Sequence, residues 1–220
     1  MYVIGVTGGI ACGKSMVSNE IKKYGAKIVN ADSMAHWQMQ PYGEIYNAYI
    51  EHFGKEILNE YEQIDRRIVG EKVFNDKVEL QWINNVTHPI LLKYMRQRLV
   101  NYQQQGIPIV VLDVPLLFEA GWNKECDEVW VVHLRRSLQI RRLMIRNELT
   151  QEEAALRIGA QLTADERMKR ADIVINNSKN KKSTRTQVNK LMQYKFPHLI
   201  TNYENYLTKM MNNELGMNIE

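Results

Sequence analysis

Near its start, the chain carries residues whose types and spacing suit the binding of a polyphosphate. They run Gly8-Gly9-Ile10-Ala11-Cys12-Gly13-Lys14-Ser15 and fit the pattern G-x-x-x-x-G-K-[ST]. Gly8 and Gly13 permit backbone conformations that a Cβ forbids, so that successive N–H groups can point inward around an anion. Lys14 would then reach the outer phosphates, and the Ser15 hydroxyl would bind Mg²⁺.

The elements on either side of this run are those needed to position it. Residues 2–6 are short and apolar, as a buried parallel strand should be. The residues after the run place Val17, Ile21 and Tyr24 on one face of a predicted helix that ends near Gly25. Strand, loop and helix therefore come in the order typical of P-loop NTPases, with the helix N-terminus facing the phosphates. A chance match in a glycine-rich turn is the weaker interpretation.

Two carboxylates follow predicted strands. Asp32 comes after residues 27–30, and Asp113 ends the apolar run 108–113. Because ligands of open α/β sheets bind at the carboxyl ends of strands, both should face the phosphates. One would take a proton from an attacking hydroxyl, and the other would help to hold Mg²⁺. The structural alternatives are Asp32 as the N-cap of a helix beginning at Ser33, and Asp113 bonded to the amides of a tight turn.

Arginines in the second half of the chain could act on a transferring phosphoryl group. Arg142 and Arg146 are four residues apart and share one helical face. Arg157 lies on the next predicted helix, which begins at the capping-box pattern formed by Thr150 and Glu153. The two helices resemble a closing lid that would bring guanidinium groups to the phosphates. The alternative is ordinary salt bridging with glutamates on the surface.

The remaining signals alternate between strand and helix, without an internal repeat. Strands are predicted at 27–30, 108–113, 128–133 and 172–175, which indicates a parallel sheet covered on both faces by helices. Residues 33–105 are mostly helical. Within them Asp65 is a predicted N-cap, and His88-Pro89 should separate two helices, because proline disfavours helix in the residue before it. The tail at 196–220 should form a helix that packs on the surface or partly frays.

Composition limits the possible classes of protein. The chain has 220 residues, is 45% hydrophobic and carries a formal net charge of +4, which suits an anionic substrate. It shows neither a signal-peptide pattern nor an apolar segment long enough to span a bilayer, so we expect a cytoplasmic protein without a membrane partner. Cys12 and Cys126 form no metal-binding pattern. We expect the pKa of Cys12 to be lowered by Lys14 and by the helix N-terminus.

Several further motifs accompany the phosphate loop in a fixed order, and together they resemble the dephospho-CoA kinase family from Met1 to about Asn177. The motifs are Val6-Thr7-Gly8-Gly9-Ile10 through Lys14-Ser15, Asn30-Ala31-Asp32, Ile64-Asp65-Arg66, Thr87-His88-Pro89, Asp113-Val114-Pro115-Leu116-Leu117-Phe118-Glu119, Arg157-Ile158-Gly159-Ala160-Gln161 and Ala171-Asp172. The phosphate loop alone would be generic. The Pro-Leu-Leu-Phe-Glu run after a buried strand is far more specific.

The resemblance implies an α/β fold, a P-loop NTPase fold like that of the nucleoside monophosphate kinases. A single domain at 1–220 would comprise a core at about 1–32, 106–134 and 170–195, an acceptor region at about 33–105, a lid at about 140–168 and the tail at 196–220. The implied reaction is the last step of coenzyme A biosynthesis, in which ATP, with Mg²⁺, phosphorylates the ribose 3′-hydroxyl of dephospho-CoA. The partners would be these small molecules, and the protein would be a monomer or small homo-oligomer.

The resemblance also implies roles for single residues. Asp32 would be the base, with Lys14, Arg142 and Arg146 on the phosphoryl group, and Ser15 and Asp113 at the metal. The residues implied for ATP binding are Gly9, Ile10, Ala11, Cys12, Gly13, Lys14, Ser15, Met16, Arg146 and Asn177. Those implied for the acceptor are Asp32, Asp65, His88, Leu116, Leu117 and Phe118, of which the last three could instead be core. Ala11, Cys12, Met16 and Lys179 depart from the residues common in the family, and Lys179 puts the adenine contacts in question.

Three other functions fit the sequence less well. A GTP-binding switch needs N-K-x-D, but the nearest runs, at 123–126 and 180–183, do not end in Asp. A nucleic-acid-binding module would need basic strands rich in aromatic residues or finger spacing, and neither occurs. A P-loop kinase for another small molecule shares the fold and the phosphate chemistry, and only the acceptor-site residues separate it from dephospho-CoA kinase.

Overall fold

The computed structural model describes residues 1–74 and 76–216. The chain divides into two compact units. The first joins Met1–Ile28 to the chain from Tyr102 onward, and the second is Val29–Asn101. The first unit contains the phosphate loop. The second spans nearly the same residues as the acceptor region predicted at about 33–105.

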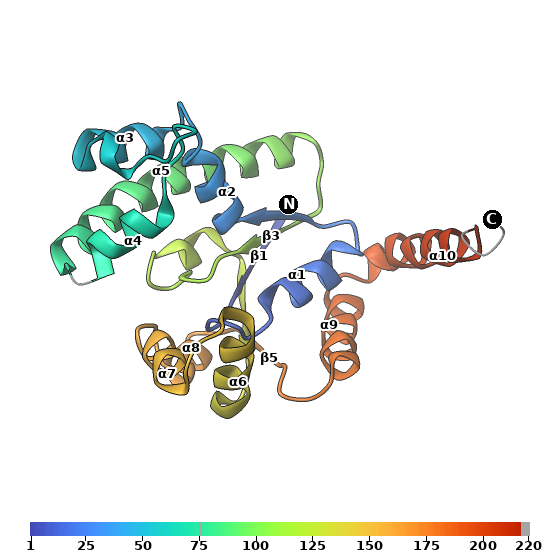
Figure 1. Cartoon of the computed structure of the whole chain (residues 1–220). Helices are drawn as coiled ribbons and strands as arrows, with labels where there is room; N and C mark the ends of the chain where they lie inside the picture. The colour runs from blue at the N-terminus through green and yellow to red at the C-terminus, as the bar shows by residue number, and fades with distance from the viewer. Residues whose placement is uncertain (75, 217–220) are drawn as a thin grey trace. The chain divides into compact units, whose positions relative to one another are not determined.

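A five-stranded sheet runs in the order β2-β3-β1-β4-β5 (Figure 1). The strands are β1 (Tyr2–Thr7), β2 (Lys27–Asn30), β3 (Ile109–Asp113), β4 (Glu128–His133) and β5 (Ile173–Asn176). β1 pairs in parallel with β3 and β4, and β4 pairs in parallel with β5. The predicted parallel sheet is confirmed, and all five residues of β3 are buried, as expected for a central strand. The phosphate loop therefore leaves the middle of the sheet.

Helices of the first unit flank this sheet. They are α1 (Lys14–Lys22), α6 (Arg136–Asn147), α7 (Gln151–Gly159), α8 (Ala164–Lys169), α9 (Lys181–Lys195) and α10 (Ile200–Gly216), with short 3₁₀ turns η2 (Trp122–Glu125) and η3 (Pro197–Leu199). α1 packs against α9, β1 and β3, and α8 packs against β4. The predicted stripe of Val17, Ile21 and Tyr24 is fully buried in the core beside Trp130, so the hydrophobic face of α1 anchors the loop that precedes it.

The tail forms a helix, α10, that joins the first unit. The Tyr203 ring stacks on Tyr24 with centroids 4.5 Å apart, and Asn202 donates a hydrogen bond to the Tyr24 carbonyl oxygen at 3.3 Å. These contacts fasten the start of α10 to the end of α1. No helix in the described part of the chain is both long enough and apolar enough to cross a membrane.

The second unit is helical, as predicted. It comprises α2 (Ala31–Gln38), α3 (Glu44–Phe53), η1 (Lys55–Ile57), α4 (Arg66–Phe74) and α5 (Lys77–Gln104). The rings of Tyr49, Phe53 and Trp82 pack against one another with centroids 5.3 to 5.9 Å apart. Asp65 caps α4 by accepting a hydrogen bond from the Arg67 N–H at 2.8 Å, which confirms the predicted N-cap.

The predicted break at His88-Pro89 was wrong, because α5 continues through Pro89. A proline inside a helix removes one backbone hydrogen bond and destabilises the helix by about 3 kcal/mol. The turns after it compensate for this loss by burying Leu91 and Met95, which are 5% and 0% exposed. Tertiary packing therefore outweighs the local preference of the His-Pro pair.

Candidate active site

The phosphate loop has the backbone that its glycines predicted. Gly13 is left-handed with φ +92°, immediately before α1 begins. At Gly8 an added Cβ would lie 2.5 Å from the Val132 carbonyl oxygen, so the limit there is space. Ala11 is also left-handed, with φ +61°, although it carries a Cβ. The tip of the loop therefore holds an alanine in a conformation that favours glycine.

The charged residues of the loop suit an anion. The Lys14 ammonium reaches back across the loop and donates a hydrogen bond to the Gly8 carbonyl oxygen at 3.3 Å. Ser15 lies exposed in the first turn of α1, which has no acidic side chain to oppose the positive end of the helix dipole. A phosphate at this helix N-terminus would meet backbone N–H groups, the Lys14 ammonium and the exposed Ser15 hydroxyl.

Asp113 ends β3 in register with Val6, next to the start of the loop. It is 3% exposed, and its Oδ2 accepts a hydrogen bond from the Ser18 hydroxyl at 2.9 Å. One partner of this carboxylate is thus a hydroxyl of α1. This bond fixes a carboxylate at the carboxyl end of the central strands.

The predicted lid segment surrounds the outer side of the loop. Gln139 Nε2 on α6 donates to the Ile10 carbonyl oxygen at 2.8 Å, and Gln161 Oε1 accepts from the Ile10 N–H at 2.9 Å. Arg142 Nη1 lies 3.8 Å from the position that a Cβ on Gly13 would occupy. Arg146 is exposed on the same helix and donates to Asn147 at 2.9 Å. The structure therefore brings Arg142 to the loop.

Thr150 caps α7 with the predicted reciprocal pair. The Glu153 N–H donates to the Thr150 hydroxyl at 3.2 Å, and the Thr150 N–H donates to the Glu153 carboxylate at 2.8 Å. This bond lowers the pKa of Glu153 below its usual value. The capping box is confirmed, so the sequence correctly predicted where α7, the second helix of the predicted lid, begins.

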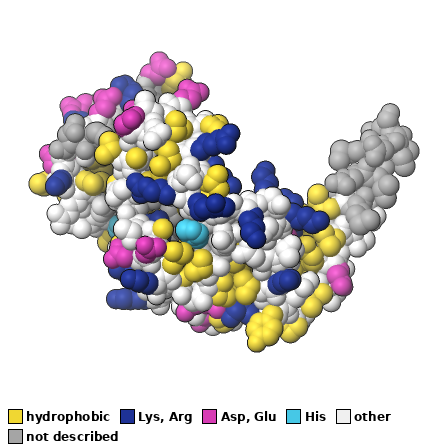
Figure 2. Space-filling view, turned by 90° about the horizontal axis from the view of Figure 1, so that it is seen from below, with side chains coloured by type: hydrophobic (Ala, Val, Ile, Leu, Met, Phe, Trp, Pro, Cys, Tyr) yellow, Lys and Arg dark blue, Asp and Glu magenta, His cyan; other side chains and the backbone are white. Residues whose placement is uncertain are grey.

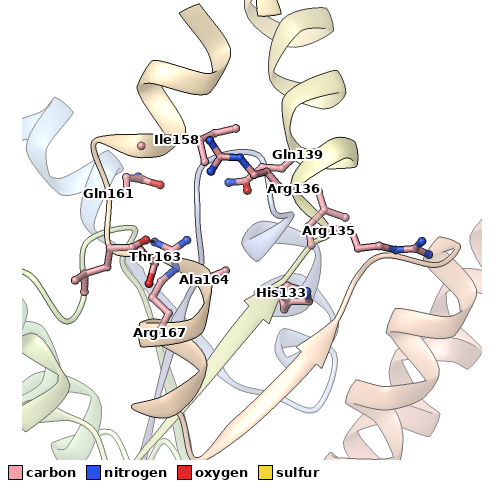
Figure 3. A pocket seen from close by; sticks show the side chains of 12 residues that line it. His133, Arg135, Arg136, Gln139, Ile158, Gln161, Thr163, Ala164 and Arg167 are labelled. Atoms are coloured by element: carbon pink, nitrogen blue, oxygen red, sulfur yellow. Dashed lines mark hydrogen bonds between the residues drawn. The ribbon is translucent and has the colours of Figure 1, made fainter. Parts of the chain in front are cut away.

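A cavity of about 290 Å³ lies between the end of β4, α6 and the α7–α8 segment (Figure 3). Its lining includes Arg136, Gln139, Gln161 and Arg167. Arg167 is only 4% exposed, and it donates to the Leu162 carbonyl oxygen. Arg167 and Gln139 are not among the site residues that the sequence predicts. No pattern distinguishes these side chains from their charged and polar neighbours, whereas Gln161 belongs to a motif already singled out.

Asn177 braces the loop from the other side. Its Nδ2 donates to the Cys12 carbonyl oxygen at 2.8 Å, and its Oδ1 accepts from the Thr184 hydroxyl at 2.8 Å. The residue implied for ATP binding is therefore 3% exposed and in contact with the loop backbone. Its contact with adenine stays a prediction.

The expectation of a lowered pKa for Cys12 was wrong. The thiol is 3% exposed, and burial raises its pKa above the ordinary value. The charges of Arg167 and Lys14 offset only part of that effect. Burial disfavours the thiolate because the apolar core cannot solvate it, and the local sequence could not show that the side chain turns inward.

The three residues after Pro115 differ in their surroundings. Leu117 is 0% exposed and packs into the core, and Phe118 is 9% exposed with the Arg170 guanidinium 5.9 Å from its ring centroid. Leu116 is the exposed member, at 36%. For Leu117 the surroundings match the alternative of core packing, and Leu116 is the residue with surface to offer a ligand.

The second unit contains Asp32, Asp65 and His88. Asp32 is exposed in the first turn of α2, but the cap of this helix is Asn30, whose side chain accepts from the Ser33 N–H at 2.8 Å. The capping alternative for Asp32 was therefore wrong, because the helix begins earlier than predicted. Burial lowers the pKa of His88, which favours a neutral imidazole at physiological pH.

Asp32 lines a cavity of about 370 Å³ within this unit. The other lining residues are mainly apolar, with one cation: Ala35, Met39, Tyr49, Ile64, Arg66, Val69, Gly70 and Ile83. Arg66 Nη2 is 2.6 Å from His36 Nδ1. A carboxylate and a guanidinium on apolar walls could orient a molecule that has both an apolar and an anionic part.

The donors near the loop fit a metal that is held mostly by its phosphate ligand. Among the described residues, no three His, Cys, Asp or Glu side chains group as a metal site. Mg²⁺ in nucleotide sites takes few protein ligands and keeps phosphate oxygens and waters, so the exposed Ser15 hydroxyl and the Asp113 carboxylate suffice in kind. Lys and Arg side chains also occur across the face shown in Figure 2, which suits anionic substrates.

Comparisons with known proteins identify the family of the chain. A model of the dephospho-CoA kinase family matches residues 2–183. Dephospho-CoA kinase of Carboxydothermus hydrogenoformans is 43% identical over 191 residues, which cover 87% of this chain and 93% of that protein. The enzyme of Geobacillus kaustophilus is 42% identical over 185 residues, which cover 84% of this chain and 92% of that protein.

Solved structures share the fold. Dephospho-CoA kinase from Campylobacter jejuni superimposes with a TM-score of 0.66 at 29% identity, over 87% of this chain and 95% of that one. The protein TT1252 from Thermus thermophilus gives a TM-score of 0.74 at 27% identity, over 88% of this chain and 97% of that one. The parallel sheet, the phosphate loop and the sequence match together show that the chain belongs to the dephospho-CoA kinase family of P-loop kinases.

Proposed function

We propose that this protein transfers the γ-phosphoryl group of ATP to the ribose 3′-hydroxyl of dephospho-CoA, giving coenzyme A and ADP. The observation that carries the proposal is the phosphate loop at the centre of the sheet, in a chain matched by the dephospho-CoA kinase family over residues 2–183. In the reaction a bond forms between the 3′-oxygen and the γ-phosphorus, and the bond to the β–γ bridging oxygen breaks. The proton of the 3′-hydroxyl leaves on a base.

The phosphate loop and the lid would supply the charge stabilisation. The backbone of residues 9–16 would present N–H groups to the phosphates, apart from the Ile10 N–H that Gln161 holds, and Lys14 would lie against the outer ones. Arg142, whose guanidinium is already beside Gly13, and Arg146, one turn further along α6, would face the phosphoryl group as charge spreads over its oxygens. Phosphoryl transfer depends mainly on such positioning and neutralisation.

Mg²⁺ would be held by the Ser15 hydroxyl and, directly or through water, by the Asp113 carboxylate. When bound, it would neutralise phosphate charge and orient the γ-phosphate. The hydrogen bond from Ser18 to Asp113 would keep that carboxylate fixed at the end of β3.

Asp32 would accept the proton of the 3′-hydroxyl. Its carboxylate is exposed and does not cap α2, so it is available to a substrate. The cavity that it lines within the second unit has apolar walls and the Arg66 guanidinium, which suit an acceptor with an adenine ring and a diphosphate. Asp65 and His88 would contribute to the acceptor region by shaping α4 and α5.

An acceptor-selectivity assay tests the proposal. ADP release is measured with ATP and Mg²⁺, with dephospho-CoA, AMP, CMP or adenosine as acceptor and with no acceptor. Turnover with dephospho-CoA, with a product of the mass of coenzyme A, is the expected result. An analogue of dephospho-CoA that lacks the 3′-hydroxyl should bind without turnover. Efficient turnover with a nucleotide and none with dephospho-CoA would refute the proposed substrate while leaving the kinase family intact.

A further inference from the structure

One residue at the tip of the phosphate loop, Ile10, is held at both of its backbone polar groups. The Ile10 N–H donates to Gln161 Oε1 at 2.9 Å, and the Ile10 carbonyl oxygen accepts from Gln139 Nε2 at 2.8 Å. The two glutamines come from different elements: Gln139 from α6, and Gln161 from the connection between α7 and α8 (Figure 3). Both elements belong to the segment predicted to be the lid.

Apolar packing joins the same parts. Leu143, Ala154 and Ile158 form a small buried cluster between α6 and α7, and the side chains of Ile10 and Ala11 pack against it. The tip of the phosphate loop is thus embedded in the lid helices by two hydrogen bonds and a hydrophobic contact. A movement of α6 or α7 would therefore be transmitted to the backbone of Ile10.

The loop needs such support. Gly13 and Ala11 are left-handed, and the alanine is in a conformation that is unfavourable for an L-residue. A glycine-rich loop also loses much conformational entropy when it is fixed. Gln139 is 4% exposed, so the surrounding atoms restrict its side chain, and its amide can hold the Ile10 carbonyl oxygen in place.

We propose that Gln139 and Gln161 are positioning residues for ATP: together they fix the backbone on both sides of Ile10 and thereby couple the lid segment to the conformation of the phosphate loop. The inference rests on the proposed ATP-dependent activity. Neither glutamine is placed on the reacting atoms. Their effect passes through the loop backbone, on which the phosphates are held.

The two hydrogen bonds have opposite polarity, which gives a sharp test. Gln161 must accept, so Gln161→Glu retains the bond. Gln139 must donate, so Gln139→Glu replaces the bond by two facing oxygens. Both variants add the same charge near the same loop, and each therefore controls for the electrostatic effect of the other. ATP binding, measured by calorimetry without acceptor, should weaken at least threefold more in Gln139→Glu than in Gln161→Glu.

Leucine substitutions test the coupling. Gln161→Leu should weaken ATP binding about five- to tenfold, the change expected for the loss of one hydrogen bond to a partly buried backbone N–H. Because both side chains hold the backbone of the same residue, the double Leu variant should lose less than the product of the two single losses. Asn202→Leu, which removes a side-chain bond to the Tyr24 carbonyl oxygen at the other end of α1, should leave the Kd for ATP unchanged.

The alternative is that the glutamines only stabilise the fold. In that case Gln161→Leu would lower the Tm but bind ATP as tightly as wild type well below that Tm, and this result would overturn the inference. Equal losses in the two Glu variants would also overturn it. If wild type binds ATP but does not phosphorylate dephospho-CoA, the proposed function fails, while the comparison of ATP affinities still decides the role of the glutamines.

Discussion

The side-chain amide of Asn177 donates a hydrogen bond to the carbonyl oxygen of Cys12 across 2.8 Å. The oxygen of this side-chain amide accepts a hydrogen bond from the Thr184 hydroxyl on α9. An added Cβ on Gly13 would collide with the nitrogen of the same amide. The segment after β5 is therefore fastened to the phosphate loop and, through Thr184, to a helix packed on α1. Asn177 and Gly13 form a matched pair, because the amide fills the space that the missing side chain leaves.

Asn177→Asp should separate this bracing from other effects. The carboxylate still accepts from Thr184 but places an oxygen opposite the Cys12 carbonyl oxygen. We expect the free energy of unfolding to fall by about 1–3 kcal/mol and the Kd for ATP to rise. Urea denaturation and ATP titration measure the two effects. Asn180→Ala is the control, since it removes the cap of α9 for about 1 kcal/mol without touching the loop. An unchanged Kd in Asn177→Asp would contradict the bracing role.

Asp32→Asn tests the proposed base. The side chain is exposed in the first turn of α2 and does not cap it, so the amide should leave the helix intact. We expect kcat to fall by about 10² or more, in line with the loss of general base catalysis, while the Kd for ATP stays within about twofold of wild type. Asp76→Asn is the matched control, because Asp76 caps α5 through the Val78 N–H and Asn caps equally well. Equal losses in turnover and ATP affinity would make Asp32 a structural residue.

The elements that local chemistry specifies could be predicted from the sequence. The glycines and Lys14 define the phosphate loop, buried apolar runs define the strands, and Thr150 with Glu153 defines the start of α7. These signals act within a few residues of one another, so a linear sequence contains them.

Properties that depend on tertiary packing could not be predicted. Burial raises the pKa of Cys12 by more than the charges of Arg167 and Lys14 lower it, and this burial depends on which way the side chain turns. Pro89 disfavours helix locally, yet buried neighbours keep α5 continuous. Of the arginines near α8, only the folded chain shows that Arg167 is the one turned inward.

Alkaline pH should destabilise the protein through Cys126. Burial, followed by the charges of Asp127 and Glu125, raises the pKa of this thiol to about 12. The unfolded thiol ionises near pH 8.5, so above that pH the unfolded state binds fewer protons than the folded state, and stability falls as pH rises. One such group lowers the free energy of unfolding by about 2 kcal/mol between pH 8.5 and pH 10.

Cys126→Ala removes this contribution. Its unfolding free energy, measured in urea at pH 8 and pH 10, should fall less over that range than the wild-type value. The variant is compared with itself at the two pH values, so the loss of packing by the side chain cancels. A slope identical to wild type would show that Cys126 ionises normally in the folded protein.

Gly9→Ala should disturb the loop through side chains rather than through backbone strain. Gly9 does not have a positive φ, but an added Cβ would lie 2.6 Å from Gln139 Nε2 and 2.7 Å from Arg167 Nη2. Both side chains are buried, so they can move only by giving up their own hydrogen bonds to Ile10 and Leu162. We expect a loss of about 1–3 kcal/mol in stability, as for overpacking, together with weaker ATP binding.

Gly70→Ala is the control for this substitution, because Gly70 lies in α4 with nothing within 4 Å of an added Cβ. It should raise stability by up to about 1 kcal/mol, since alanine is the better helix former. Opposite signs for the same chemical change would show that the neighbours of Gly9 determine its identity. If Gly9→Ala retains wild-type stability and ATP affinity, then Gln139 and Arg167 can yield without loss, and the loop tip is less tightly held than the hydrogen bonds on Ile10 indicate.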